Sequence, residues 1–145
     1  MKRFSQCVSL LLVVAMVFAM PVFATETAEQ RSSAYFMKYS AYLWEIEGSK
    51  FEVWFDVTAV ETMDELGTKT IKVQRSTDEQ NWTTVQTYQK ADNSQMVASN
   101  KVAYANCVTY SYTNGYYYRA VVVLYAKKGT GTGELTVVTP TLDRT

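Results

Sequence analysis

Hydrophobic and polar residues alternate along much of this chain with a period of two, which is the period of β-strands. The clearest alternation spans residues 51–60, where one set of side chains is apolar and the other set is mostly polar. The apolar set is Phe51, Val53, Phe55, Val57 and Ala59, and the opposite set is Glu52, Trp54, Asp56 and Thr58. Residues 39–47 also alternate, and Gly48 separates the two runs. This pattern predicts a β-hairpin with one solvated face.

The longest apolar run beyond the N-terminal segment spans residues 116–126, with the sequence YYYRAVVVLYA. Its β-branched and aromatic residues favour a central β-strand over a helix. Asn114 and Gly115 precede it and supply a tight turn, because both residues tolerate positive φ. If Arg119 points to solvent, alternation directs the other set toward the core. That set is Tyr116, Tyr118, Ala120, Val122, Leu124 and Ala126.

Four further runs predict strands: residues 70–75, 82–88, 101–112 and 135–139. A Gly- and Thr-rich segment at 127–133 predicts a loop before the last of them. In residues 61–67, Thr62 and Glu65 have capping-box spacing and Gly67 follows, so we expect one helical turn crossing between sheets. The strand spacing indicates an all-β, two-sheet antiparallel β-sandwich of about seven strands.

The first 24 residues have the pattern of a secretory signal peptide. Lys2 and Arg3 precede an apolar run at residues 8–20, and Val22 and Ala24 occupy the cleavage positions. A membrane anchor is the alternative, but the apolar run is short for a membrane span. We therefore expect cleavage after Ala24 and a protein that is secreted or held at the cell surface.

Cleavage leaves 121 residues with 12 basic and 14 acidic side chains, a net charge of −2. This balance does not favour binding to nucleic acid or to an anionic membrane. Cys107 is the one cysteine left and cannot form an internal disulfide, so the hydrophobic core must stabilise the domain. We expect residues 25–35 to form a flexible polar leader and residues 36–145 to form a single domain.

The turn at Asn114-Gly115 and the following Tyr-x-Tyr-Arg-Ala-Val-x-Val resemble the penultimate strand of immunoglobulin-like and fibronectin type III sandwiches. The resemblance implies that Tyr116 or Tyr118 bonds back to the preceding corner. The candidate for the tryptophan of the second strand in such domains is Trp54, which the alternation directs outward instead.

Several other segments resemble a family of small secreted Gram-positive bacterial proteins of unknown function, domain of unknown function 6147. They lie at residues 62–67, 81–85, 118–122 and 125–129. This resemblance implies secretion and brings no activity with it.

The sequence contains no histidine. Metal sites built on imidazole and Ser-His-Asp or Cys-His catalysis are therefore excluded, and a single cysteine cannot hold a structural zinc. No glycine loop that cradles phosphate opens a helix. We expect a protein that is not an enzyme and uses no cofactor. Hydrolysis by paired carboxylates is the alternative, with Glu45, Glu47, Glu52 and Asp56 as candidates, but a solvated sheet face explains these residues.

Two further sets of residues have simpler structural interpretations. Cys107 lies among small residues, so we expect a buried packing side chain and not a reactive thiol. The oxygen ligands of a calcium site could come from Asp78, Asn81, Asp92 and Asn93, but their spacing does not match an EF-hand loop, and we expect ordinary turns.

The aromatic residues indicate function best. The chain has 11 tyrosines and three tryptophans, and the alternation leaves Trp54, Tyr117 and Tyr125 outward. Exposed aromatic rings on a sheet stack on sugars or anchor protein partners. We therefore expect a secreted or cell-envelope, non-catalytic binding module for a protein partner or a second copy of itself. A carbohydrate-binding module for an extracellular glycan is the alternative.

Overall fold

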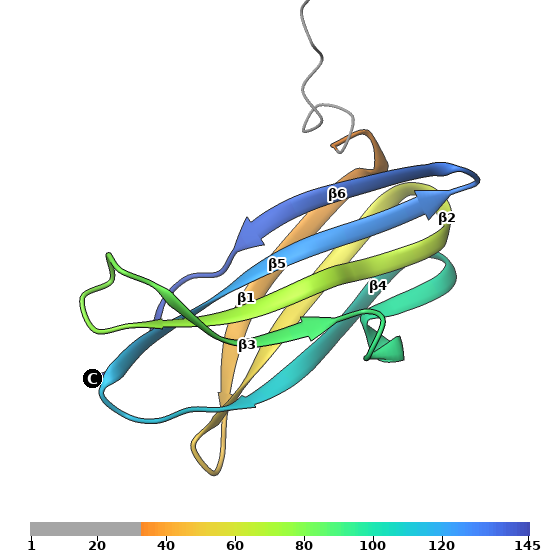
Figure 1. The fold of residues 1–145 in the computed structure, drawn as a ribbon. Coiled ribbons are helices and arrows are strands. Elements are labelled where there is room, and N and C mark those ends of the chain that lie inside the picture. Colours follow the sequence, from red (N-terminus) through yellow and green to blue (C-terminus); the bar gives the residue numbers. More distant parts are fainter. Residues whose placement is uncertain (1–32) are drawn as a thin grey trace, which may run out of the picture.

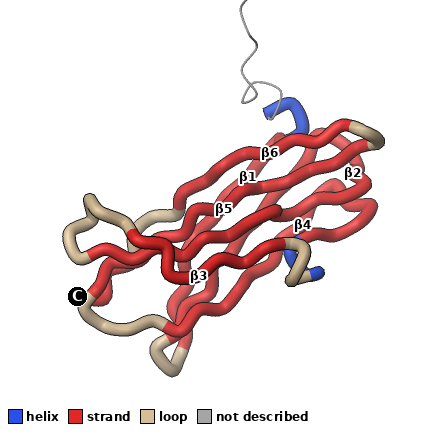
Figure 2. Tube along the Cα trace, viewed as in Figure 1, coloured by secondary structure: helices blue, strands red, loops and turns tan. Residues whose placement is uncertain are grey.

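The computed structural model describes residues 33–145. The predicted signal peptide and nearly all of the predicted leader lie outside these residues. A short 3₁₀ helix, η1 (Ser33–Tyr35), leads into the strands, and a second one, η2 (Ser94–Met96), precedes β4 (Figures 1 and 2). The strands are β1 (Phe36–Ile46), β2 (Lys50–Ser76), β3 (Thr83–Gln89), β4 (Val97–Ser111), β5 (Tyr116–Lys128), β6 (Gly131–Val138) and β7 (Leu142–Arg144).

The seven strands form one antiparallel sheet that curls around the core (Figure 1). The order is β1-β2-β5-β6, while β3 and β4 also pair with β2, and β7 pairs with β5. The expected all-β, antiparallel class with about seven strands is confirmed. Two separate sheets are not confirmed, because β2 pairs with β1 and β4 along its first half and with β3 and β5 along its second.

The helical turn expected at residues 61–67 is wrong, because β2 continues through this segment. Met63 and Leu66 are both fully buried, and Glu65 pairs across the sheet with residues of β4 and β5. An isolated turn is too short to be stable alone, whereas the extended strand buries two large side chains and completes two hydrogen-bond ladders.

Two irregularities let this long strand bend around the core. The register of β2 shifts against β4 within residues 58–63 and against β5 within residues 68–70, and such bulges increase the bend and twist of a strand. Between them, Gly67 has a φ of +157°, and a Cβ atom there would overlap the carbonyl oxygen of Met96. Glycine is therefore required where β2 passes the η2 segment.

The core follows the predicted alternation on both principal strands. On β2 the buried set is Phe51, Val53, Phe55, Val57 and Ala59, and on β5 it is Tyr118, Ala120, Val122, Leu124 and Ala126. The outward direction of Arg119 is thus the correct phase for β5. The predicted hairpin of residues 39–60 is also confirmed, with β1 and β2 joined by a turn in which Gly48 and Ser49 have positive φ.

Tyr118 links the start of β5 to the turn before it. Its hydroxyl donates to the carbonyl oxygen of Thr113 at 2.9 Å and accepts from the Thr113 N–H at 3.1 Å. Of the two tyrosines proposed for this bond, Tyr118 makes it. The ring is fully buried, so the bond fixes the turn directly against the core.

The loop expected at residues 127–133 is mostly strand. β5 continues to Lys128 and β6 starts at Gly131, so only two residues connect them. The ring of Tyr35 in η1 lies against Gly131 and Gly133, and a Cβ on Gly133 would come within 2.5 Å of the ring carbon Cδ2. The repeated glycines therefore serve the close packing of Tyr35 on β6.

Candidate functional site

Three aromatic side chains gather on the outer surface of the β1-β2-β4 part of the sheet. Tyr42 of β1 lies directly opposite Trp54 of β2, and Trp44 lies opposite Glu52 one row further along. On the other side of β2, Cys107 of β4 is opposite Trp54. We call Tyr42, Trp44 and Trp54 the aromatic face. Each points away from the core because it alternates with a residue of the core-facing set.

The geometry of the aromatic face is held by one stacking contact and one hydrogen bond. The rings of Tyr42 and Trp54 are nearly parallel, with an angle of 8° and 6.4 Å between ring centroids. The indole N–H of Trp54 donates to Oε2 of Glu52 at 2.8 Å. Trp44 is 61% exposed and Tyr42 is 40% exposed. Tyr42 and Trp54 are therefore ordered by these contacts, while Trp44 and Tyr42 are accessible to a ligand.

A shallow hollow of about 270 Å³ lies between these side chains. Its lining consists of Tyr42, Trp44, Glu52 and Trp54. Three walls are aromatic and one carries a carboxylate, so the hollow offers π faces and a negative charge to whatever enters it.

Cys107 borders the aromatic face and is only half-buried, so the expected buried position is wrong. It points outward because it shares the phase of Ala105 and Thr109 on β4. Desolvation, followed by the charge of Glu52 and a hydrogen bond to it, raises the pKa of the Cys107 thiol. The thiol is therefore protonated at neutral pH, which makes it a poor nucleophile.

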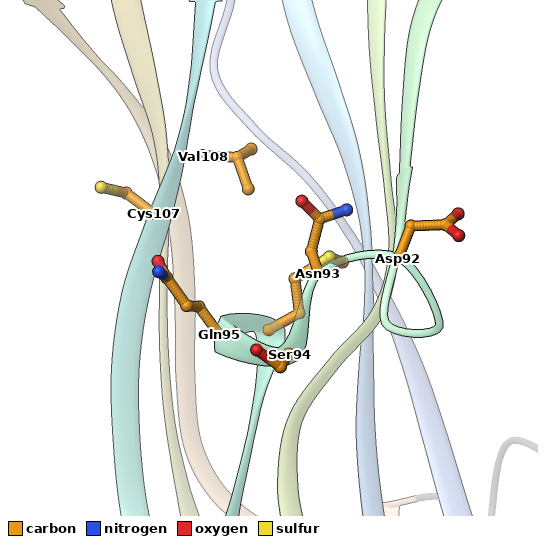
Figure 3. A pocket seen from close by; sticks show the side chains of 7 residues that line it. Asp92, Asn93, Ser94, Gln95, Cys107 and Val108 are labelled. Atoms are coloured by element: carbon orange, nitrogen blue, oxygen red, sulfur yellow. The ribbon is translucent and has the colours of Figure 1, made fainter.

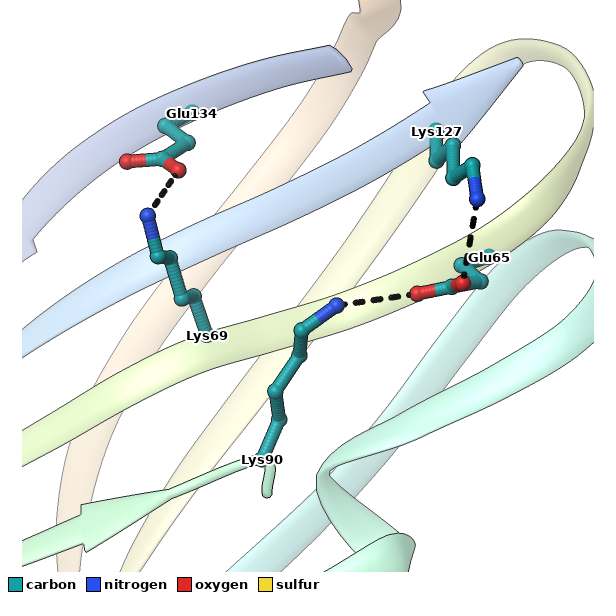
Figure 4. A network of polar contacts seen from close by, with 5 residues as sticks. All are labelled: Glu65, Lys69, Lys90, Lys127 and Glu134. Carbon is teal, nitrogen blue, oxygen red and sulfur yellow. Dashed lines mark hydrogen bonds and ion pairs between the residues drawn. The ribbon is translucent and has the colours of Figure 1, made fainter. Parts of the chain in front are cut away.

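Tyr125 lies on the outer side of β5, as predicted, but it is only 7% exposed, so the expected availability to a partner is wrong. The ammonium group of Lys90, at the end of β3, lies 3.9 Å from the centroid of its ring. Figure 4 shows how that lysine is held: its Nζ binds Glu65 at 3.0 Å, and Lys127 pairs with the other oxygen of the same carboxylate at 3.7 Å. A second ion pair, Lys69 of β2 with Glu134 of β6, reaches across β5 in the same view.

Tyr117 is half-buried on β5, where it pairs with Ser76 of β2 and Asp143 of β7. It and Tyr125 both lie on β5, whereas Trp54 lies on the first half of β2. The three predicted contact residues are therefore not brought together. The partners of Trp54 are Tyr42 and Trp44, which the sequence analysis did not select as candidate site residues.

The acidic residues proposed for hydrolysis do not form a catalytic pair. Glu45 lies on the opposite face of the hairpin from Glu52, with an ion pair to Arg144 and a hydrogen bond from the Tyr112 hydroxyl at 2.6 Å. Asp56 and Glu52 share the outer face but are separated by Trp54. Glu45 is therefore not brought beside Glu52 or Asp56.

The proposed calcium ligands serve turns. Asp78 accepts hydrogen bonds from the backbone N–H groups of Gln80 and Asn81, from the Asn81 amide and from the Ser76 hydroxyl. These bonds, led by the one from the Asn81 backbone, lower the pKa of Asp78 far below its usual value. Among the described residues, no group of acidic, cysteine or histidine side chains could hold a metal ion.

Asp92 and Asn93 border a second hollow, of about 250 Å³, between the η2 segment and β4 (Figure 3). Its other side chains include Gln95 and Cys107. The backbone carbonyl of Gln95 already accepts a hydrogen bond from the Tyr104 hydroxyl at 2.7 Å. This bond fastens the η2 segment to the body of β4.

No protein-family model matches this sequence, and no curated protein matches it. Among solved structures, the chain is similar to the crystal structure of Spo0M, a sporulation control protein from Bacillus subtilis, with a TM-score of 0.40 and 8% sequence identity. The match covers 70% of this chain and 47% of that one, so the chain spans about half of its length. A similarity this low supports no statement on function. Over the described residues, no helix has the length and apolar character needed to cross a bilayer.

Proposed function

We propose that this protein is a secreted or cell-envelope, non-catalytic binding module that engages a protein partner or a second copy of itself through the aromatic face. The observation that carries the proposal is that Tyr42, Trp44 and Trp54 meet on one surface and that Trp44 is 61% exposed there. Secretion is supported by the pattern of residues 1–24.

The surroundings of the aromatic face support binding. The outward positions next to it are small or polar, with Cys107, Ala105 and Thr109 on β4 and Asp56 on β2. An apolar centre with a polar rim on a rigid sheet is the usual anatomy of a recognition surface. Tryptophan and tyrosine also contribute more binding energy per residue than most side chains.

A test replaces Trp44 and Trp54 separately with alanine and measures self-association by sedimentation and partner capture by pull-down. Trp82→Ala is the matched control, since this indole packs against Arg119 and bonds to Glu79, away from the aromatic face. We expect loss of assembly or capture in the first two variants alone. Unchanged behaviour in both would reject the proposal.

A carbohydrate ligand is the second candidate, favoured by the exposed indole of Trp44 beside the carboxylate of Glu52. Sugar rings stack their apolar faces on such indoles and bond their hydroxyls to nearby carboxylates. A glycan array read with tryptophan fluorescence separates the candidates. If no plant, mucin or peptidoglycan sugar on the array binds the protein, the carbohydrate hypothesis is rejected.

The finer description of the fold as an immunoglobulin-like or fibronectin type III-like sandwich is also a proposal. The bond from Tyr118 back to Thr113 supports it, since a tyrosine at the start of a late strand makes an equivalent bond in those domains. An experimental structure tests it through the strand order, which must divide into two facing sheets.

A further inference from the structure

The hollow on the aromatic face combines three electron-rich rings with one carboxylate. Tyr42, Trp44 and Trp54 form its aromatic walls and Glu52 its polar wall. The face of an aromatic ring carries the negative part of the ring quadrupole, so it attracts cations placed over it. Every wall of this hollow therefore favours positive charge.

Glu52 carries a negative charge that its neighbours do not neutralise. It accepts a hydrogen bond from the indole N–H of Trp54, and this donor is uncharged. In contrast, Glu45 and Glu65 each pair with an arginine or lysine. Across residues 33–145, no salt bridge involves Glu52.

We propose that this hollow binds a quaternary ammonium group, such as the trimethylammonium head of choline. The inference rests on the proposed function, since it names the ligand chemistry of the same aromatic face. The charge complementarity between the head group and the Glu52 carboxylate selects a cation, and the three rings select one without hydrogen-bond donors.

A primary ammonium fits less well for two reasons. It has three N–H donors that need acceptors, whereas three of the four side chains that line the hollow are aromatic and only Glu52 offers a carboxylate, one oxygen of which already accepts from Trp54. A quaternary ammonium has no donors, sheds its hydration more readily, and its bulk suits an open hollow of about 270 Å³.

The experiment titrates the purified protein with choline chloride and follows tryptophan fluorescence and NMR shifts, with sodium chloride at equal ionic strength as the blank. A parallel titration uses the neutral isostere of choline, in which a tert-butyl group replaces the trimethylammonium head. We expect saturable binding of choline and at least about tenfold weaker binding of the neutral compound.

Two variants locate the site. Glu52→Gln keeps the size and the acceptor oxygen but removes the charge, so we expect about tenfold weaker choline binding. Trp44→Leu removes an exposed wall, and we expect a similar loss. Glu61→Gln is the charge-matched control, because Glu61 pairs with Lys128 in the bend of β2 and does not line the hollow. It should bind choline as the unmodified protein does.

Equal binding of choline and its neutral isostere would overturn the proposal, as would tighter binding of lysine methyl ester or of a neutral sugar than of choline. Unchanged choline binding in Glu52→Gln would also overturn it. If choline does not bind but partner capture still depends on Trp44 and Trp54, the quaternary ammonium site is refuted and the proposed function stands. If choline does not bind and partner capture is also independent of both tryptophans, the quaternary ammonium site and the proposed function are both refuted.

Discussion

The hydroxyl of Tyr118 makes two hydrogen bonds to the backbone of Thr113, and Tyr118→Phe removes both while keeping the buried ring. Each bond contributes about 0.5–1.5 kcal/mol net. Thr113 is on the exposed side of the turn, so water replaces part of the lost bonding. We therefore expect a decrease of about 1–2 kcal/mol in the free energy of unfolding, with a fall in Tm of roughly 4–8 °C.

Urea unfolding followed by fluorescence measures this decrease, and the m-value should not change because the exposed surface is the same. Tyr110→Phe is the matched control. Its ring lies 6.0 Å from that of Tyr118 in the same cluster, but its hydroxyl has no hydrogen bond among the described residues. We expect the control to change stability by less than about 0.5 kcal/mol. Equal effects of the two substitutions would refute the assigned role of the Tyr118 hydroxyl.

Further predictions concern a glycine, the cysteine and a turn. Gly67→Ala forces a Cβ into a backbone carbonyl and should destabilise the protein by more than about 2 kcal/mol in urea unfolding, whereas Gly48→Ala, with open space around it, should lose only about 1 kcal/mol. Native Cys107 should react with a thiol reagent at pH 8 more slowly than Cys107 in the unfolded chain. Glu52→Gln should accelerate the reaction of the native protein by lowering the thiol pKa. An unchanged rate in this variant would show that Glu52 does not raise the thiol pKa. The carboxyl of Asp78 has a folded pKa below its unfolded value, so the stability that it contributes is present above the unfolded pKa and is lost as the pH falls toward the folded pKa. Asp78→Asn should remove this part of the acid dependence of Tm, measured in thermal melts at a series of pH values. An identical dependence of Tm on pH in the variant would show that the turn does not contribute.

The regular parts of the fold were predictable because their side chains alternate without interruption. In residues 51–59 and 118–126, each core position is apolar and two residues from the next, so strand direction and burial follow from the sequence alone. The turn between β1 and β2 was equally clear, since Gly48 supplies the positive φ that it needs.

The irregular parts were not predictable by alternation. The spacing from Met63 to Leu66 has a helical period, but both side chains are buried on an extended strand. The register of this strand shifts against β4 before Met63 and against β5 after Leu66. In β3, both Val85 and Tyr88 pack against the core although their spacing is odd, because the register also shifts beside Val85. A bulge depends on two strands at once, and a single run of residues does not contain that information.

The site was predicted in part. The outward phase of Trp54 was correct because it depends only on its own strand. The burial of Tyr125 was not predicted because Lys90, which lies over its ring, is far away in the sequence. The position of Lys90 depends on the pairing of β3 with β2. The contact of Trp54 with Tyr42 needed only the register of the first hairpin, so this part of the aromatic face was within reach of sequence reasoning.

The single long strand β2 also limits how the molecule can be engineered or divided. A cut near Val60 would leave each fragment with unsatisfied ladder groups along an open edge, so neither fragment is a self-sufficient module. New termini for a circular permutant, or the insertion point for a reporter domain, belong instead in the polar connection between β2 and β3, where no ladder would be interrupted.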